Sequence, residues 1–277
     1  MKLAYFGDVV GRSGRRALGE HLPRLRAELK FDFVCINAEN AAGGFGITES
    51  VADELYGYGA DCLTLGNHAW DQREALTYIA REPRLLRPNN YPERLDIPGR
   101  GAEVYTLSSG ARVGVILTMG RIFMDPLDDP FCAVERDIEN LALGQVVDAL
   151  ILDVHAEATS EKAAMGHQFD GRASLVVGSH THVPTADTRI LAGGTAYQTD
   201  AGMCGDYDSV VGMRKDRSLH KFTTRLPGER NEPADGEGTV CGVYVETDDR
   251  TGLATRVEPI RVGGELEERV PRARVTV

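Results

Sequence analysis

Acidic, amide and imidazole side chains recur along this chain just after short apolar segments. These residues are Asp8, Glu39, Asn40, Asn67, His68, His155, His180 and His182. The apolar segment before each of them has the length and composition of a β-strand. Because the carboxyl ends of strands form the ligand crevice of open α/β sheets, we expect these residues to meet at one site although they are far apart in the sequence.

Seven of these side chains offer metal ligands, namely two carboxylates, two amides and three imidazoles. They are Asp8, Glu39, Asn40, Asn67, His155, His180 and His182. This set without a thiolate suits manganese, iron, zinc or cobalt and does not separate them; we expect iron or manganese, with zinc as the alternative. Seven ligands are too many for one tetrahedral ion but enough for two ions, about 3.5 to 4 Å apart, that share a bridging carboxylate. The sequence therefore predicts a dinuclear site.

The charge balance favours a small anionic substrate. The chain has 31 Lys and Arg against 42 Asp and Glu, a formal net charge of −11, which disfavours long-range attraction of DNA or RNA. Two divalent ions with the carboxylates of Asp8 and Glu39 would keep a local charge of about +2. A bridging hydroxide, as the attacking group, and one phosphodiester anion would neutralise it. We therefore expect a small phosphodiester substrate and not long nucleic acid.

His68 adjoins a predicted ligand, so its ring can face the leaving group without binding metal. An imidazole near its unperturbed pKa of about 6.5 is a competent general acid; the alternative role is a supporting hydrogen bond. Asp71 precedes a helical pattern and has Glu74 three residues on. This capping-box spacing favours a helix N-cap over catalysis for Asp71.

Strand-like and helix-like segments alternate through the first two thirds of the chain. Strands are expected at 3–6, 31–36, 61–65, 104–107, 113–118, 149–154 and 175–177, and helices at 18–29, 48–58, from 71, and at 134–147. Pro23 predicts a kink or a late start in the first helix. From Ala192 helical pattern is scarce, and strands at 239–247 and 253–262 predict a hairpin. The alternation predicts a layered α/β domain.

Membrane and secreted classes are disfavoured. No apolar run approaches the roughly 20 residues that span a bilayer, and the five cysteines are scattered and odd in number, as is typical of free thiols in a reducing compartment. We expect a cytoplasmic protein.

Four motifs resemble those of calcineurin-like metallophosphoesterases. They are Phe6–Asp8, Leu65–His68, the strand-end His155 and Gly178–His182. Two departures from the motifs of the broad superfamily narrow the match to one subfamily. Val9-Val10 follows Asp8, where the superfamily usually has a histidine two residues on, and Asn37–Asn40 replaces the usual Gly-Asp motif. The segments that resemble the bacterial YmdB-type phosphodiesterases are Gly7–Arg15, Asn37–Gly43, Asp153–Lys162 and Ser179–Asp187. The likeness is most distinctive over residues 1–215.

The resemblance implies a four-layer α/β/β/α metallophosphoesterase fold and a single domain over residues 1–277. The implied ligand sets share Glu39: one adds Asp8, Asn40 and His182, and the other adds Asn67, His155 and His180. Hydrolysis of phosphodiesters that include 2′,3′-cyclic nucleotides is implied as well, with a connection to RNA metabolism. A homo-oligomer and a protein partner in RNA metabolism are further expectations.

Three alternative functions stay open at this point. The same site suits a phosphomonoesterase or nucleotidase, and it also suits a regulator that binds nucleotide or a partner without turnover. Length and composition permit a metal-dependent amidohydrolase on a β/α barrel. Those barrels tend to place their His-x-His pair at the first strand, whereas here the pair is His180 and His182.

Overall fold

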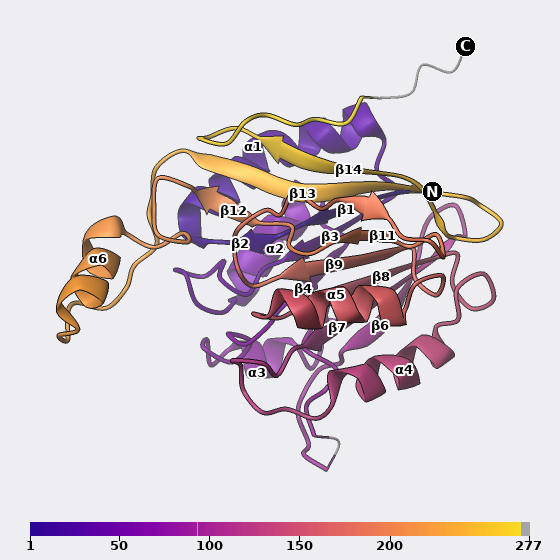
Figure 1. Ribbon diagram of the computed structural model, residues 1–277, viewed down its shortest axis with the longest axis horizontal. Coiled ribbons are helices and arrows are strands. Elements are labelled where there is room, and N and C mark those ends of the chain that lie inside the picture. The colour runs from indigo at the N-terminus through magenta and orange to yellow at the C-terminus, as the bar shows by residue number, and fades with distance from the viewer. Residues whose placement is uncertain (93, 273–277) are drawn as a thin grey trace.

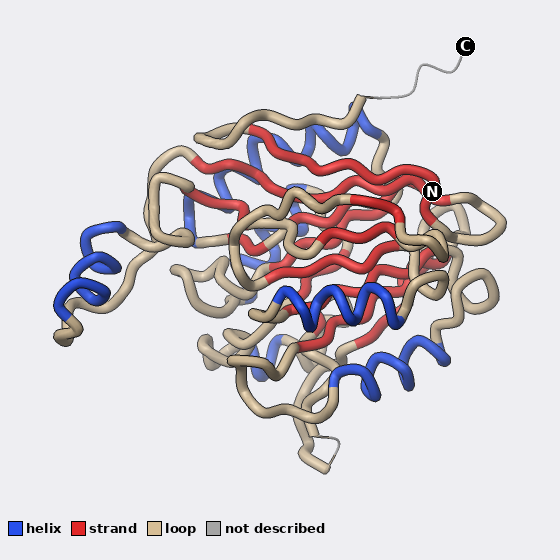
Figure 2. Tube along the Cα trace, viewed as in Figure 1, coloured by secondary structure: helices blue, strands red, loops and turns tan. Residues whose placement is uncertain are grey.

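The computed structural model describes residues 1–92 and 94–272, which form two β-sheets packed face to face with helices on the outer faces (Figure 1). Figure 2 shows the strands enclosed between helices. This arrangement confirms the expected α/β/β/α sandwich. Residues 93 and 273–277 of the single domain expected over 1–277 lie outside the described residues.

The first sheet has eight strands. They are β1 (Lys2–Phe6), β2 (Asp8–Val9), β3 (Phe33–Asn37), β4 (Cys62–Thr64), β5 (Leu85–Leu86), β12 (Met203–Asp206), β13 (Gly238–Thr247) and β14 (Ala254–Val262). Their order is β2-β12-β13-β1-β3-β4-β5, and β14 pairs with β13. β1, β3, β4 and β5 are parallel, whereas β13 is antiparallel to β1. β13 and β14 form the predicted hairpin.

The second sheet has six strands. They are β6 (Ala102–Thr106), β7 (Arg112–Met119), β8 (Ala149–His155), β9 (Leu175–Ser179), β10 (Arg189–Ile190) and β11 (Ala196–Gln198). Their order is β10-β11-β9-β8-β7-β6, and β7, β8, β9 and β11 are parallel. The carboxyl ends of these parallel strands therefore lie at one edge, where ligands bind in such sheets.

Three buried clusters hold the layers together. Successive residues of a strand point to opposite faces of its sheet. Leu3 and Tyr5 of β1 therefore pack between the two sheets with Val115 of β7, while Ala4 and Phe6 pack against helices. A third cluster joins the outer face of the second sheet to its own helices.

Five helices cover the two sheets. α1 (Gly11–Leu29), α2 (Glu49–Tyr58) and α3 (Ala75–Tyr78) pack on the first sheet, and α4 (Pro130–Asn140) and α5 (Thr159–Gln168) pack on the second. The leucine stripe of α1 is buried as predicted. Of the two effects expected from Pro23, a kink or a late start, the late start is wrong, because the first turn of α1 packs against β12 and the helix continues through Pro23.

A further expected helix has different bounds in the structure. α4 covers 130–140 and not 134–147, because Asp129 caps the backbone N–H groups of Phe131 and Cys132 and Pro130 occupies the first helical position. α6 (Lys215–Thr224) lies in the region where helical pattern is scarce. It stands away from the body at the left of Figure 1, and its Leu219 and Phe222 are exposed, so no core-facing stripe marks it in the sequence.

Within residues 1–92 and 94–272, none of the helices combines the length and the apolar character that crossing a membrane requires.

Candidate metal centre

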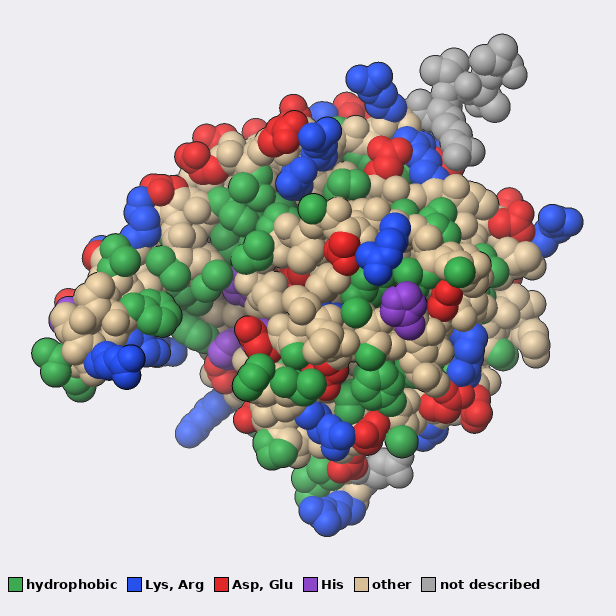
Figure 3. Space-filling model, viewed as in Figure 1, with side chains coloured by type: hydrophobic (Ala, Val, Ile, Leu, Met, Phe, Trp, Pro, Cys, Tyr) green, Lys and Arg blue, Asp and Glu red, His purple; other side chains and the backbone are tan. Residues whose placement is uncertain are grey.

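The structure brings the eight candidate residues together at the carboxyl ends of strands from both sheets. Asp8 begins β2, Glu39 and Asn40 follow β3, Asn67 and His68 follow β4, His155 ends β8, and His180 and His182 follow β9. Five of them are buried, and Asn67, His68 and His180 are half-buried. Figure 3 shows histidine side chains in a hollow between the body and the arm that carries α6.

Three side chains converge on the ring of His155. Its Nε2 atom lies 3.0 Å from Glu39 Oε1 and 3.0 Å from Asn67 Oδ1. The Nδ1 atom of His180 lies 3.2 Å from the same nitrogen. Glu39, His155 and His180 each offer a ligand atom, and these atoms all lie within 4.8 Å of one another. One imidazole nitrogen cannot satisfy three such neighbours by hydrogen bonding, so the convergence suits a shared cation.

A second group surrounds His182. Its Nε2 atom lies 3.3 Å from Asn40 Oδ1 and 3.9 Å from Asp8 Oδ1. The amide Nδ2 of Asn40 donates to the carbonyl of Gly44 at 2.9 Å, which leaves its Oδ1 facing His182. The backbone N–H of His180 donates to both oxygens of Asp8, at 3.2 and 3.1 Å. Asp8 thereby connects the second group to the first.

Each of the three histidines has an acceptor on its outer nitrogen. His155 Nδ1 donates to Ser179 Oγ at 2.9 Å, and His182 Nδ1 donates to the carbonyl of Val211 at 2.8 Å. His180 Nε2 lies 3.2 Å from Glu157 Oε2. In a neutral imidazole these bonds leave the inner nitrogen with a lone pair that faces the site. When His155 is unprotonated, these inward lone pairs face one another, an arrangement that fits a metal ion.

Gly66 shows how closely these groups approach the backbone. A Cβ atom there would lie 2.3 Å from His155 Nε2 and 2.4 Å from Glu39 Oε2. Only glycine leaves room for both side chains at this position. The glycine of the Leu65–His68 motif is therefore explained by the donor atoms packed against it.

Burial and mutual charge shift the pKa values of the site. Burial opposes ionisation of both Glu39 and His155, but their attraction outweighs it, lowering the pKa of Glu39 to about 2 and raising that of His155 to about 9. Burial, followed by repulsion from His155, lowers the pKa of His180 to about 3. Burial raises the pKa of Asp8 to about 6, although His182 and His155 oppose this shift. The unprotonated ring of His180 is thus available to a metal over a wide pH range.

His68 lies at the rim of these groups. Its backbone N–H donates to Glu39 Oε2 at 2.9 Å, and its ring Nδ1 lies 2.8 Å from Asp71 Oδ2. The ring also makes an edge contact with Phe45, with centroids 5.2 Å apart. The expectation that Asp71 caps a helix is wrong, because α3 begins at Ala75 with Glu74 at its N-cap and the turn directs the Asp71 carboxylate to His68.

A buried hydrogen-bond network behind His155 was not predicted from the sequence. The Asp153 carboxylate accepts from Tyr5 at 2.7 Å, Thr64 at 2.6 Å and Ser179 at 2.7 Å. Burial raises the pKa of Asp153, although its hydroxyl donors oppose the shift. Asp153 and Ser179 lie inside motifs of the family resemblance, which is the only sequence signal that marks them.

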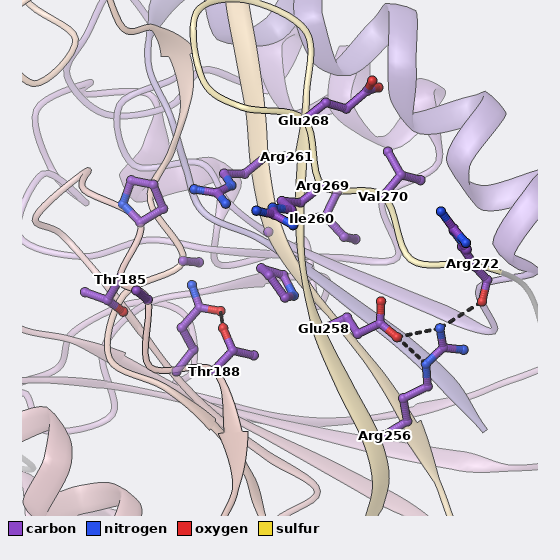
Figure 4. Close-up of a pocket in the computed structure, with 16 residues that line it drawn as sticks. Thr185, Thr188, Arg256, Glu258, Ile260, Arg261, Glu268, Arg269, Val270 and Arg272 are labelled. Atoms are coloured by element: carbon purple, nitrogen blue, oxygen red, sulfur yellow. Dashed lines mark hydrogen bonds and ion pairs between the residues drawn. The ribbon is translucent and has the colours of Figure 1, made fainter.

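A cavity of about 720 Å³ lies beside the chain that follows His182 (Figure 4). Pro184 and Thr185 line it, together with arginines such as Arg256, which pairs with Glu258. It includes none of the eight candidate residues. Cavity size therefore does not locate the candidate metal centre.

Known proteins have similar sequences and similar folds. Residues 4–260 match the family described as YmdB-like protein. The 2′,3′-cyclic-nucleotide 2′-phosphodiesterase of Bacillus subtilis is 45% identical over 262 residues, covering 95% of this chain and 97% of that protein. A hypothetical protein from Thermus thermophilus has a crystal structure with a TM-score of 0.88 and 40% identity, covering 96% of this chain and 100% of that one. A phosphatase structure from Mycoplasma pneumoniae has a TM-score of 0.88 and 32% identity, covering 95% and 93%. The chain therefore belongs to the YmdB-like protein family, as its motifs predict.

Proposed function

We propose that this chain is a dinuclear, metal-dependent phosphodiesterase that hydrolyses small phosphodiesters such as 2′,3′-cyclic nucleotides. The observation that carries the proposal is the convergence of seven donor side chains into two adjacent groups with their lone pairs facing inward. The name of the B. subtilis relative supports the same substrate class.

The two groups of donors would hold two ions, with Glu39 as a ligand of both. Asp8, Asn40 and His182 would complete one site, and Asn67, His155 and His180 would complete the other. The oxygen and nitrogen donors suit iron or manganese, with zinc as the alternative. When bound, such a pair of ions polarises phosphoryl oxygens and lowers the pKa of water toward neutrality.

His68 is the proposed general acid. Its Nδ1–H donates to Asp71, which leaves Nε2 to carry the proton that the leaving oxygen requires. The Asp71 carboxylate orients the ring through this hydrogen bond, and the edge contact with Phe45 limits rotation of the imidazole. These contacts favour acid catalysis over a purely structural role for His68.

The net charge of the chain and its free cysteines support a small substrate in the cytoplasm. A net charge of −11 repels long nucleic acid at a distance, whereas the metal centre attracts a single phosphodiester locally. All five cysteines are free, as in proteins of a reducing compartment. A homo-oligomer and a protein partner in RNA metabolism remain part of the proposal.

Metal removal and product analysis test the function together. The metal-loaded protein is expected to convert 2′,3′-cyclic AMP to a nucleoside monophosphate, to lose this activity on chelation, and to regain it with Mn²⁺. Release of inorganic phosphate as the main product would favour the phosphomonoesterase alternative. Tight nucleotide binding without turnover in the metal-loaded protein would favour the regulator.

A further inference from the structure

Two of the proposed metal ligands adopt a backbone conformation that residues with side chains rarely take. The φ angles of His180 and His182 are 96° and 64°, in the left-handed region that favours glycine. Such conformations persist only where the surrounding structure enforces them. The loop that carries both histidines must therefore be held from outside.

Asp200 holds this loop at two points. Its Oδ2 atom accepts hydrogen bonds from the backbone N–H and the hydroxyl of Thr181, at 3.1 and 2.8 Å. Its backbone carbonyl accepts from the N–H of Thr185 at 3.0 Å. Thr181 lies between the two histidines and Thr185 lies beyond His182, so one residue fastens the loop on both sides of His182.

Lys162 compensates the charge of Asp200 in the interior. The Nζ atom of Lys162, on α5, donates to Asp200 Oδ2 at 2.6 Å, and both side chains are only 1% exposed. A carboxylate buried this deeply needs a charged partner and full hydrogen bonding. A Cβ at Gly178 would lie 1.9 Å from the carbonyl oxygen of Thr199 and 2.7 Å from Lys162 Cδ, so glycine leaves room for both the neighbouring backbone and the lysine.

We propose that Lys162 and Asp200 are positioning residues that hold His180 and His182 in the conformation required to bind metal. The inference rests on the proposed function of the two histidines. The contacts that Lys162 and Asp200 make with each other and with the loop, called the clamp below, are present without metal. It also gives a role to Lys162, the last residue of the Asp153–Lys162 motif.

Four variants test the clamp. Lys162→Met removes the charge at similar length, and Thr181→Val removes one bond to Asp200 without touching the ion pair. Thr181→Ser keeps the hydroxyl, and Arg172→Met breaks an exposed ion pair with Glu135 as a matched control. Metal affinity is measured by titration, and amide hydrogen exchange over residues 178–185 is measured in the metal-free protein.

We expect metal affinity to fall by about 10- to 100-fold in Lys162→Met, the usual effect of losing a partner behind a ligand, with faster exchange in the loop. Thr181→Val is expected to show smaller changes in the same direction, while Thr181→Ser and Arg172→Met resemble the wild type. If Lys162→Met does not fold, the comparison of Thr181→Val with Thr181→Ser decides.

Failure of the proposed function and failure of this inference give different results. A wild-type protein that binds no metal would overturn the proposed function, and with it the role assigned to the clamp. Normal metal binding by the wild type, with affinity and exchange unchanged in Thr181→Val and in folded Lys162→Met, would overturn the inference alone.

Discussion

The Nδ1 atom of His68 lies 2.8 Å from the Oδ2 atom of Asp71, three residues further along the chain. The two side chains are partly exposed, at 28% and 43%, so they face the solvent side of the candidate metal centre. A carboxylate in this position orients the ring, so that Nε2 points away from Asp71. The pairing therefore suits His68 to proton transfer at the solvent side of the centre.

His68→Ala is expected to keep its metal but to lose roughly 10²- to 10⁴-fold in turnover on substrates with poor leaving groups, the usual contribution of a positioned acid. Asp71→Asn is expected to cause a smaller loss of the same kind. An activated aryl ester needs no proton and is expected to be much less affected. Equal losses on both substrates would show that His68 is structural.

Glu39→Gln is expected to lower metal occupancy at both sites, because one carboxylate is proposed to bridge them. Elemental analysis of the purified variant measures this directly, against about two ions per chain for the wild type. Glu54→Gln serves as the matched control, since Glu54 pairs with Arg15 outside the site. Full occupancy in Glu39→Gln would exclude the bridging role.

The stability of the metal-free protein is expected to fall as the pH rises above neutrality. Burial opposes protonation of His155, but Glu39 and Asp8 outweigh it and raise the pKa to about 9, against about 6.5 in an unfolded chain. A raised folded-state pKa stabilises the fold below about pH 6.5, and this contribution is lost as the pH rises through about 9. Chemical denaturation at about pH 7 and about pH 10 measures this loss.

Proton release on metal binding is a second measure of the raised pKa of His155. Because the ring must lose its proton to bind metal, titration with Zn²⁺ near pH 7.5 is expected to release about one proton from this residue. Calorimetry in two buffers with different ionisation enthalpies detects the proton. Binding heats that do not depend on the buffer would contradict the assignment.

Ser179→Ala is expected to weaken metal binding at the site that contains His155 by about 10- to 100-fold, since it removes the acceptor of the ring Nδ1–H. Thr64→Val is the matched control: it removes a hydroxyl from Asp153 but leaves the bond between Ser179 and His155. Equal effects of the two variants would indicate that the network acts through general stability.

Hydrolysis of 2′,3′-cyclic AMP is expected to fall only modestly between about 50 and 200 mM salt. A substrate held through six to ten phosphate contacts would lose about 10³- to 10⁵-fold over that range. Steady-state kinetics at several salt concentrations, with long RNA as the comparison, measure the difference. A steep dependence, or faster cleavage of long RNA, would favour a nuclease.

The sequence predicts most strands and the convergence of the eight candidate residues, because buried strands leave a clear apolar pattern and the polar residues follow directly. Other features depend on contacts that no local pattern records. Asp71 has the spacing of a helix cap, and only the observed turn directs it to His68. Lys162 and Asp200 meet across 38 residues. α6 lacks a buried stripe because its apolar side chains face solvent, so periodicity does not reveal it.

The carboxylate of Asp153 belongs to the second sheet but accepts hydroxyl donors from Tyr5 and Thr64 of the first. The same carboxylate receives Ser179, which sets the direction of the His155 ring. The orientation of a proposed metal ligand is therefore fixed by how the two sheets are aligned. Sliding of one sheet over the other is expected to turn that ring. We therefore expect resistance of the sandwich to shear to govern how firmly a metal ion is held at His155.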